Sequence, residues 1–268
     1  MNAMPPEEEA MHPTFRWLER GEGEPIVLLH GLMGRMDHWD STLQALAETG
    51  RPIAPDVPIL DPALVDPSVS GLTEHVRTFL DALDVRRAVV GGNSLGGHLA
   101  LELALREPER VSGLILTGSS GLFERSFARG VPHVPTTEFV REKMEEIFYD
   151  ASLVTSAWVE AVRQTLTTRV YARRILQVAR SAKRSNLESR LGQIGAPTLL
   201  VWGKDDRITP PDVAERFAAL IPNAELVFIA NCGHAPMLEQ PSVFNAIVGD
   251  WLGDTRASRR RATGEVAR

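Results

Sequence analysis

Two hydrophobic patterns follow one another along the chain. Short runs rich in Val, Ile and Leu, such as residues 26–29, are expected to form buried strands. Longer segments with apolar residues three or four positions apart, such as residues 71–83, are expected to form helices. The two kinds alternate up to residue 117, which predicts an α/β fold with a mostly parallel, doubly wound sheet.

These patterns define the expected elements. The strands are expected at residues 14–19, 26–29, 51–57, 87–90, 111–117, 197–202 and 225–229. The helices are expected at residues 39–48, 71–83, 98–105, 138–148, 156–165, 171–182, 212–220 and 242–252. Because several strands are apolar without interruption, we expect helices on both faces of the sheet.

The alternation stops between residues 122 and 191, where only helical patterns occur. Because this block separates two strands of one sheet, we interpret it as a helical cap inserted into a core of residues 14–121 and 192–253. Residues 1–13 and 254–268 are interpreted as disordered tails, the second of them basic. The cap carries twelve Lys/Arg and eight Asp/Glu, which indicates either solvated helix faces or a mild preference for anionic substrates.

Composition narrows the class of protein. The 268 residues, 43% of them hydrophobic, suffice for one large α/β domain. A net charge of -6 argues against general nucleic-acid binding, and a single cysteine excludes an internal disulfide. No signal-peptide pattern and no apolar run of about 18 residues occurs. We therefore expect a cytoplasmic protein that acts on a small molecule, without a membrane or nucleic-acid partner. The sequence does not indicate an oligomeric state.

Residues 91–97 read Gly-Gly-Asn-Ser-Leu-Gly-Gly and join an expected strand to an expected helix. Gly92, Ser94 and Gly96 match the G-x-S-x-G spacing of a nucleophile elbow, whose strained turn needs residues without Cβ beside the serine. At a helix N-terminus, unpaired N–H groups favour negative charge developing near Ser94. A simple tight turn or a phosphate-binding turn is the alternative, but the glycine spacings of nucleotide-binding loops are absent.

A serine nucleophile needs a general base, usually histidine, and a carboxylate that orients it. Later loops supply both. Asp205 and Asp206 follow the strand at 197–202, and His234 follows the strand at 225–229. The order Ser, Asp, His suits this sheet topology.

With these loops, residues 15–252 resemble the α/β-hydrolase family. The resemblance rests on four motifs: H-G-x-x-G at 30–34, G-x-S-x-G at 92–96, W-G-x-x-D at 202–206 and G-H at 233–234. It implies that Ser94 is the nucleophile and His234 the general base and acid. It also implies that Asp206 is the orienting carboxylate, with Asp205 as the alternative.

The same resemblance implies an oxyanion hole formed by the backbone N–H groups of Leu32 and Leu95. His30 is interpreted as a loop-shaping residue, His98 as packed or solvated, and Cys232 as a small buried filler. We expect no cofactor, and no metal site, because the remaining histidines lack metal-ligand spacing.

Serine at the elbow disfavours the dehalogenases and epoxide hydrolases that share this fold. The elbow is similar to the G-N-S-M-G-G of hydrolases that cleave carbon-carbon bonds in ring-fission products. Those enzymes usually have tryptophan after the catalytic histidine, whereas this chain has Ala235 there. They also usually have a cap arginine that binds the substrate carboxylate. Arg163 lies near that place and is the candidate substrate-binding residue, although an ungapped alignment puts Val162 there.

The sequence thus predicts a serine hydrolase that cleaves a small carboxylic ester through an acyl-enzyme. A carbon-carbon bond hydrolase acting on ring-fission dienoates is the first alternative. A non-catalytic small-molecule receptor with the same fold is the second.

Overall fold

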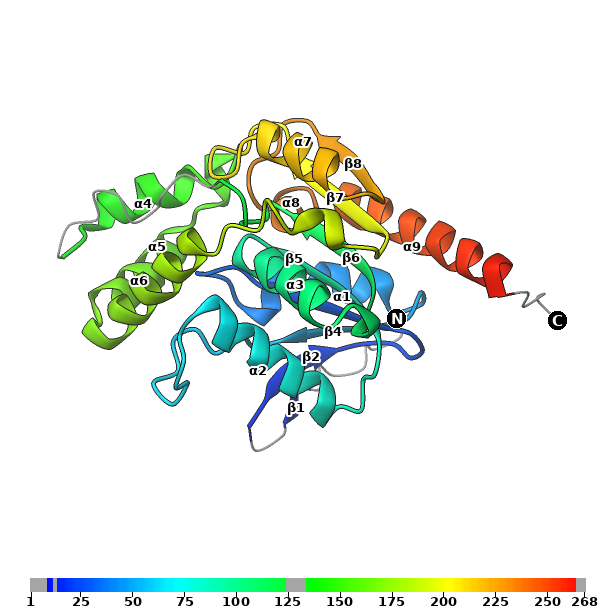
Figure 1. Ribbon diagram of the computed structural model, residues 1–268. Coiled ribbons are helices and arrows are strands. Elements are labelled where there is room, and N and C mark those ends of the chain that lie inside the picture. The colour runs from blue at the N-terminus through cyan, green and yellow to red at the C-terminus, as the bar shows by residue number, and fades with distance from the viewer. Residues whose placement is uncertain (1–8, 12–13, 124–133, 264–268) are drawn as a thin grey trace, which may run out of the picture.

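The computed structural model describes residues 9–11, 14–123 and 134–263. At its centre is an eight-stranded sheet with the order β1-β2-β4-β3-β5-β6-β7-β8 (Figure 1). The strands are β1 (Glu9–Met11), β2 (Arg16–Glu19), β3 (Pro25–Leu29), β4 (Arg51–Pro55), β5 (Ala88–Asn93), β6 (Val111–Thr117), β7 (Thr198–Gly203) and β8 (Ala224–Ile229). Strands β3 to β8 pair in parallel, whereas β1 and β2 pair antiparallel at one edge. The predicted mostly parallel sheet is therefore confirmed.

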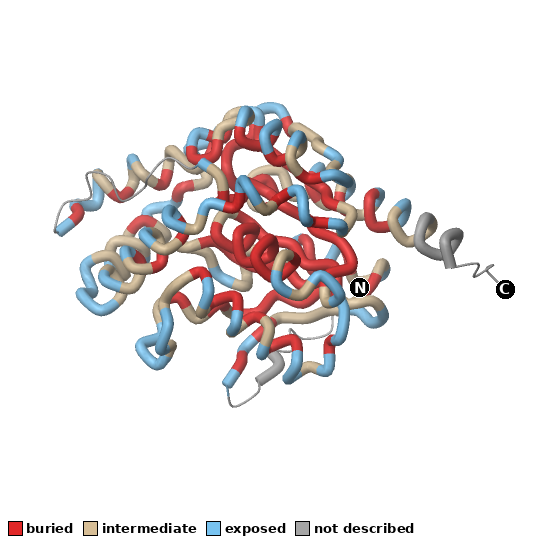
Figure 2. Tube along the Cα trace, viewed as in Figure 1, coloured by how far each residue is buried: buried red, intermediate tan, exposed pale blue. Residues whose placement is uncertain are grey.

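Helices cover both faces of this sheet. In chain order, the α-helices of the described residues are α1 (Asp40–Leu46), α2 (Val69–Ala82), α3 (Leu95–Arg106), α4 (Thr137–Glu145), α5 (Ser156–Thr167), α6 (Arg169–Arg184), α7 (Pro211–Leu220), α8 (Pro236–Glu239) and α9 (Pro241–Thr263), of which α4, α5 and α6 do not lie on the faces of the sheet. Helices α2, α3 and α7 contribute to one apolar cluster, and α1 and α9 contribute to another. Every residue of β5, β6 and β7 is buried between these layers (Figure 2).

Neighbouring residues of β5 pack against the helices on opposite faces of the sheet. Val90 packs in the cluster that contains Phe79 of α2, and Val89 packs in the cluster that contains Trp39 and Phe244. Successive side chains of a strand point to opposite faces, so an unbroken apolar strand supplies both clusters. Burying a large apolar side chain contributes about 1.5–3 kcal/mol, which explains why such strands form the centre.

Helices α4, α5 and α6 lie together between β6 and β7 in the chain and sit beside one end of the sheet (Figure 1). The side chains of Thr136 and Thr155 accept hydrogen bonds from the first turns of α4 and α5, which fixes where these helices begin. Val140 and Val159 join the cluster of α1 and α9, whereas Val178 of α6 joins the cluster of α2 and α3. These three helices, which form most of the predicted cap, are thus anchored to both helical layers.

The termini differ from the expected tails. Strand β1 lies within residues 1–13 and pairs through its main chain with β2, a contact that needs no apolar pattern. Helix α9 continues past Gly253 to Thr263, so the tail predicted from residue 254 is wrong over that stretch. Ala and Arg favour helix, and extending an existing helix avoids the cost of nucleation. The ion pair between Arg256 and Glu24 also holds this extension, at 2.8 Å. The other residues of both predicted tails lie outside the described residues.

Candidate active site

The turn between β5 and α3 holds Ser94 in an unusual conformation. Its φ of 54° and ψ of -117° lie in a region that residues other than glycine rarely adopt, at a cost of roughly 1–3 kcal/mol. The Ser94 N–H donates to the carbonyl of Thr117 at 3.0 Å, and the Ser94 carbonyl accepts from the N–H of Ser120 at 3.1 Å. The end of β6 and the loop after it therefore hold the strained turn in place.

Both motif glycines are required by close backbone approach. A Cβ on Gly92 would overlap the main chain of Gly96, and a Cβ on Gly96 would overlap the carbonyl oxygen of Leu29. The turn can therefore close only with glycine at these positions, as the elbow motif predicts. The Ser94 side chain remains partly exposed.

Asp206 and His234 meet in the loops that follow β7 and β8. The Oδ2 atom of Asp206 lies 2.9 Å from His234 Nδ1 and accepts a hydrogen bond from Thr209 Oγ1 at 2.8 Å. Its Oδ1 atom accepts from the N–H groups of Ile208 and Thr209, at 2.8 and 2.9 Å. Asp206 is only 3% exposed. The structure thus brings Asp206 to His234, whereas Asp205 is partly exposed and its N–H donates to the Cys232 carbonyl.

The surroundings of Asp206 favour its charged form. Burial acts to raise the pKa of this carboxyl, but the charge of His234 and hydrogen bonds from His234 and Thr209 outweigh it. The pKa of Asp206 therefore lies below its ordinary value, and the carboxylate is ionised where it can orient the imidazole.

The main chain of His234 is held from two directions. Its N–H donates to the carbonyl of Ile147 at 2.7 Å, and its carbonyl accepts from Asn93 Nδ2 at 2.9 Å. A Cβ on Gly118 would lie 2.7 Å from His234 Nδ1, so the loop after β6 packs against the imidazole. Since Asn93 directly precedes Ser94, the strand that ends at Ser94 also positions the loop of His234.

The loop after β3 passes beside the elbow. A Cβ on Gly31 would lie 3.3 Å from Ser94 Cβ, and the N–H of Gly34 donates to the Gly31 carbonyl at 2.9 Å, closing a turn around Leu32. Leu95 is the first residue of α3, where N–H groups lack intrahelical partners. The oxyanion role of Leu32 and Leu95 stays a prediction that this arrangement supports.

His30 shapes that loop. Its Nε2 atom accepts a hydrogen bond from the N–H of Val57 at 3.0 Å, which assigns the ring proton to Nδ1, 2.9 Å from the Gly31 carbonyl. His30 is buried. Cys232 is also buried, and burial raises the pKa of its thiol, so the reactive thiolate is disfavoured.

Arg163 pairs within its own helix. Its Nε and Nη2 atoms donate to the two carboxylate oxygens of Glu160, each at 2.8 Å, one turn earlier on α5. Val162, the adjacent residue, packs against the apolar cluster of α1 and α9. The structure therefore gives Arg163 a local partner, and its substrate-binding role stays a prediction.

Three positioning residues were not identified from the sequence. Thr209 contacts both Asp206 Oδ2 and His234 Nδ1, the latter at 3.3 Å. Aspartate often bonds the backbone of residues that follow it in a turn, so the sequence could have indicated a contact between Asp206 and Thr209. Asn93 lies inside the elbow motif, but no sequence pattern predicts that its side chain bonds the His234 carbonyl. Ile147 acts through its main-chain carbonyl, which no side-chain pattern reports.

The described part of the chain shows neither a candidate metal site nor a candidate membrane span. It holds no group of three or more His, Cys, Asp or Glu side chains suited to a metal ion. Within the same residues, none of the helices combines the length and the apolar character needed to cross a membrane.

Residues 26–247 match the family model described as the alpha/beta hydrolase family. The chain is 34% identical to a 2-hydroxy-6-oxononadienedioate/2-hydroxy-6-oxononatrienedioate hydrolase of Cupriavidus pinatubonensis, over 86% of this chain and 87% of that protein. It is 30% identical to a 2-hydroxy-6-oxo-6-phenylhexa-2,4-dienoate hydrolase of Burkholderia cepacia, over 88% and 90% of the two chains.

Two solved structures share the architecture. One is MGS-MChE2, an alpha/beta hydrolase enzyme from a sediment metagenome of the Mar Chica lagoon, with a TM-score of 0.75 and 33% identity over 91% of this chain and 97% of that one. The other is the meta-cleavage product hydrolase CumD of Pseudomonas fluorescens, with a TM-score of 0.77 and 26% identity over 90% of this chain and 94% of that one. From the family match, and from relatives covered over most of their length, we conclude that this chain belongs to the alpha/beta hydrolase family.

Proposed function

We propose that this hydrolase cleaves a carbon-carbon bond in a 2-hydroxy-6-oxo-dienoate, the type of compound formed by ring fission. The observation that carries the proposal is the similarity to relatives named for such substrates, at 30 and 34% identity over most of both chains. The placement of Ser94, Asp206 and His234 after β5, β7 and β8, at the same edge of the sheet, supports a serine mechanism. The relatives thus favour the carbon-carbon alternative over the ester that the sequence suggested first.

In the proposed reaction, Ser94 Oγ attacks the ketone carbon and His234 takes the serine proton on Nε2. Asp206 holds the other ring nitrogen and stabilises the imidazolium. The N–H groups of Leu32 and Leu95 would stabilise the oxyanion, a contribution of about 2.7–4 kcal/mol per donor.

Cleavage of the carbon-carbon bond then leaves the acyl part on Ser94. For this step the substrate first becomes its 2,6-dioxo tautomer, in which the enol proton has moved to C5. The electron pair of the broken C5–C6 bond then passes into a conjugated dienolate, whose oxygen receives the proton from His234. Water, activated by the same histidine, releases the carboxylic acid and restores the serine. The sum is one substrate and one water giving one acid and one hydroxydienoate.

Ester hydrolysis is the second candidate, since the same residues can transfer an acyl group from an alcohol to water. Ala235 favours it, because the resemblance places tryptophan after the catalytic histidine in carbon-carbon hydrolases. Ala235 is buried against the cluster of α1 and α9.

The test compares kcat/KM for a 2-hydroxy-6-oxo-dienoate, followed by loss of its absorbance, with kcat/KM for p-nitrophenyl acetate and butyrate. We expect the dienoate to be preferred and its turnover to be lost in Ser94→Ala. Ser119→Ala is the matched control, because it removes a nearby buried hydroxyl whose one hydrogen bond among the described residues goes to the adjacent Ser120 carbonyl.

A preference for the esters, lost in Ser94→Ala, would replace the proposal with the ester hydrolase. Tight binding of either compound class without turnover would instead favour the receptor.

A further inference from the structure

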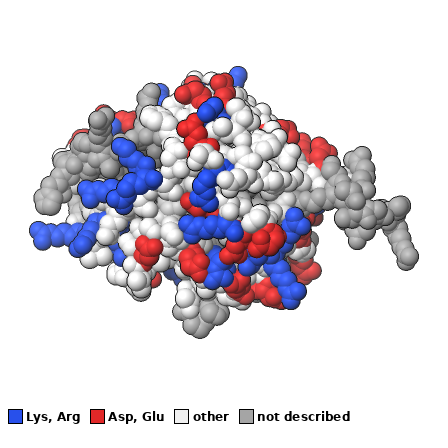
Figure 3. All heavy atoms as spheres, viewed as in Figure 1, with Lys and Arg blue, Asp and Glu red and all other residues white. Residues whose placement is uncertain are grey.

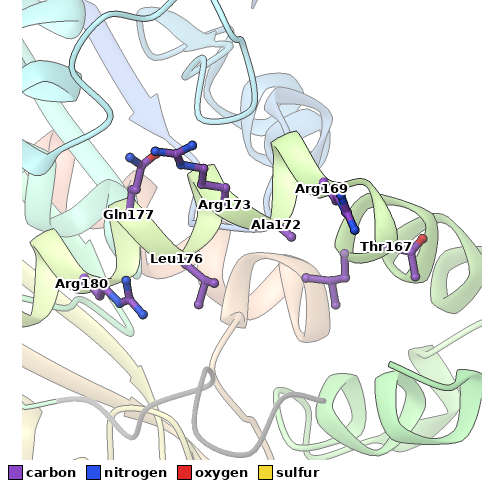
Figure 4. Close-up of a pocket in the computed structure, with 8 residues that line it drawn as sticks. Thr167, Arg169, Ala172, Arg173, Leu176, Gln177 and Arg180 are labelled. Atoms are coloured by element: carbon purple, nitrogen blue, oxygen red, sulfur yellow. The ribbon is translucent and has the colours of Figure 1, made fainter. Parts of the chain in front are cut away.

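The predicted cap reaches the loop of His234 through the segment that follows α4. Lys and Arg atoms gather over the outer surface of the cap (Figure 3). The groove beside α6 is lined by side chains of residues 166–180, from α6 and the end of α5 (Figure 4). Its described lining does not include the residues of the Ser-His-Asp site. Residues 147–150 of the cap, in contrast, bond the loop of His234 and the helix after it.

Glu239 joins these two parts of the chain. Its Oε1 atom accepts a hydrogen bond from the Asp150 N–H at 2.7 Å, and its Oε2 atom accepts one from the Gly233 N–H. Asp150 lies in the cap segment and Gly233 directly precedes His234, so one carboxylate holds both segments through separate oxygens. A carboxylate is a stronger acceptor of N–H groups than a neutral oxygen.

Helix stability does not explain a glutamate at this position. Glu239 is the last residue of α8, and the C-terminal end of a helix favours cations over carboxylates. Its hydrogen bonds among the described residues go to main-chain N–H groups and not to a basic side chain. The two main-chain contacts therefore account for Glu239 better than its place in the helix does.

Two further contacts bring the same segments together. The His234 N–H donates to the Ile147 carbonyl at 2.7 Å, and a Cβ on Gly233 would overlap the oxygen of that carbonyl. Glu239 thus binds both main chains close to where they touch. Small displacements matter here, because misplacing a reacting group by about 1 Å can lower a rate about 10²-fold.

We propose that Glu239 is a positioning residue, which holds the loop of His234 and residues 147–150 of the cap as one unit. Glu239 acts through His234 and does not touch the reacting atoms. Because the cap segment shares this carboxylate, a displacement of residues 147–150 would also displace the general base. The proposal rests on the proposed role of His234 and adds no step to the reaction.

The first test is inactivation of the full chain by diisopropyl fluorophosphate. Ser94 Oγ forms the bond to phosphorus, fluoride leaves, and His234 takes the serine proton. We expect Glu239→Ala, which removes both acceptors, to lower the second-order rate constant about tenfold. Glu239→Gln keeps one oxygen acceptor and should lose less. The matched control is Glu215→Ala, at an exposed position on α7, which should react like wild type.

This rate separates positioning from stability. Circular dichroism measures the folded fraction of each variant, and a purely structural role would leave the rate constant of the folded protein unchanged. Should Glu239→Ala fail to fold, the same rate criterion applies to Glu239→Gln.

The second test is amide hydrogen exchange, followed by mass spectrometry. Glu239→Ala should speed exchange both in peptides that cover residues 147–150 and in peptides that cover residues 230–234, because the Asp150 and Gly233 N–H groups lose their acceptor. Glu215→Ala should leave both segments unchanged. Neither test uses a substrate, so a different substrate class would not alter the results.

Three outcomes count against the proposal. A wild-type chain that does not react at Ser94 would overturn it together with the proposed serine mechanism. A wild-type chain that reacts, and a folded Glu239→Ala that reacts equally fast, would overturn this proposal alone. Faster exchange of only one segment in Glu239→Ala would also overturn it, because the carboxylate would then not join the two.

Discussion

Asp206→Asn changes few atoms but should reverse one critical hydrogen bond. Asp206 Oδ1 accepts two backbone N–H groups, from Ile208 and Thr209, so only the amide oxygen of asparagine can occupy that position. The amide NH2 must then replace Oδ2 and face His234 Nδ1. An NH2 donor there favours the tautomer that carries its proton on Nε2. That nitrogen can no longer take the proton of Ser94.

The magnitude follows from this change of tautomer. The equivalent replacement in a serine protease triad lowers kcat by about 10⁴-fold, which corresponds to about 5 kcal/mol of activation free energy. We expect a similar loss here. The buried site also loses charge-assisted hydrogen bonds, so the free energy of unfolding should fall by about 1–3 kcal/mol.

The assay is kcat for wild type, Asp206→Asn and Asp205→Asn on any substrate that the wild type turns over. Asp205→Asn should stay near the wild-type value, because the contact of Asp205 with Cys232 is made by its main chain. A loss smaller than about tenfold for Asp206→Asn, or a larger loss for Asp205→Asn, would refute the assignment of the orienting carboxylate.

Three further predictions address the elbow and its surroundings. Gly96→Ala should destabilise the fold by about 3 kcal/mol, because its Cβ would overlap the Leu29 carbonyl. Gly249→Ala in α9 has open space around the new methyl group and should stabilise the fold by about 0.5–1 kcal/mol. The free energies of unfolding of the Gly96→Ala and Gly249→Ala variants, measured by urea denaturation, test this difference. Asn93→Ala removes the amide that donates to the His234 and Thr117 carbonyls. It should lower kcat more than it changes KM, which steady-state kinetics would show. Burial lowers the pKa of His98 to about 4, so protonation favours the unfolded chain as pH falls from about 6.5 towards 4. Between pH 7 and 5, His98→Gln should therefore lose roughly 2 kcal/mol less stability than wild type, and equal losses would contradict this.

The sequence predicted what depends on side-chain pattern. Apolar runs located seven of the eight strands, and the glycines around Ser94 indicated the strand-to-helix turn. It missed what depends on the main chain. Strand β1 is fixed by backbone pairing, and Ile147 reaches the histidine loop through its carbonyl. The three-residue spacing of Glu160 and Arg163 on a helix is also compatible with an ion pair, which is the contact that the structure shows.

The hydrogen bond from the His234 N–H to the Ile147 carbonyl affects how this enzyme can be re-engineered. Ile147 follows α4, so a cap segment helps to hold the loop of the proposed general base. A Cβ on Gly233 would lie 2.9 Å from the Cα of Phe148, so the main chains of the two residues are too close for either to shift towards the other. A chimera that takes its cap from a relative should therefore keep residues 147–148 with the core. Otherwise the graft would also move the loop that carries His234, the proposed general base.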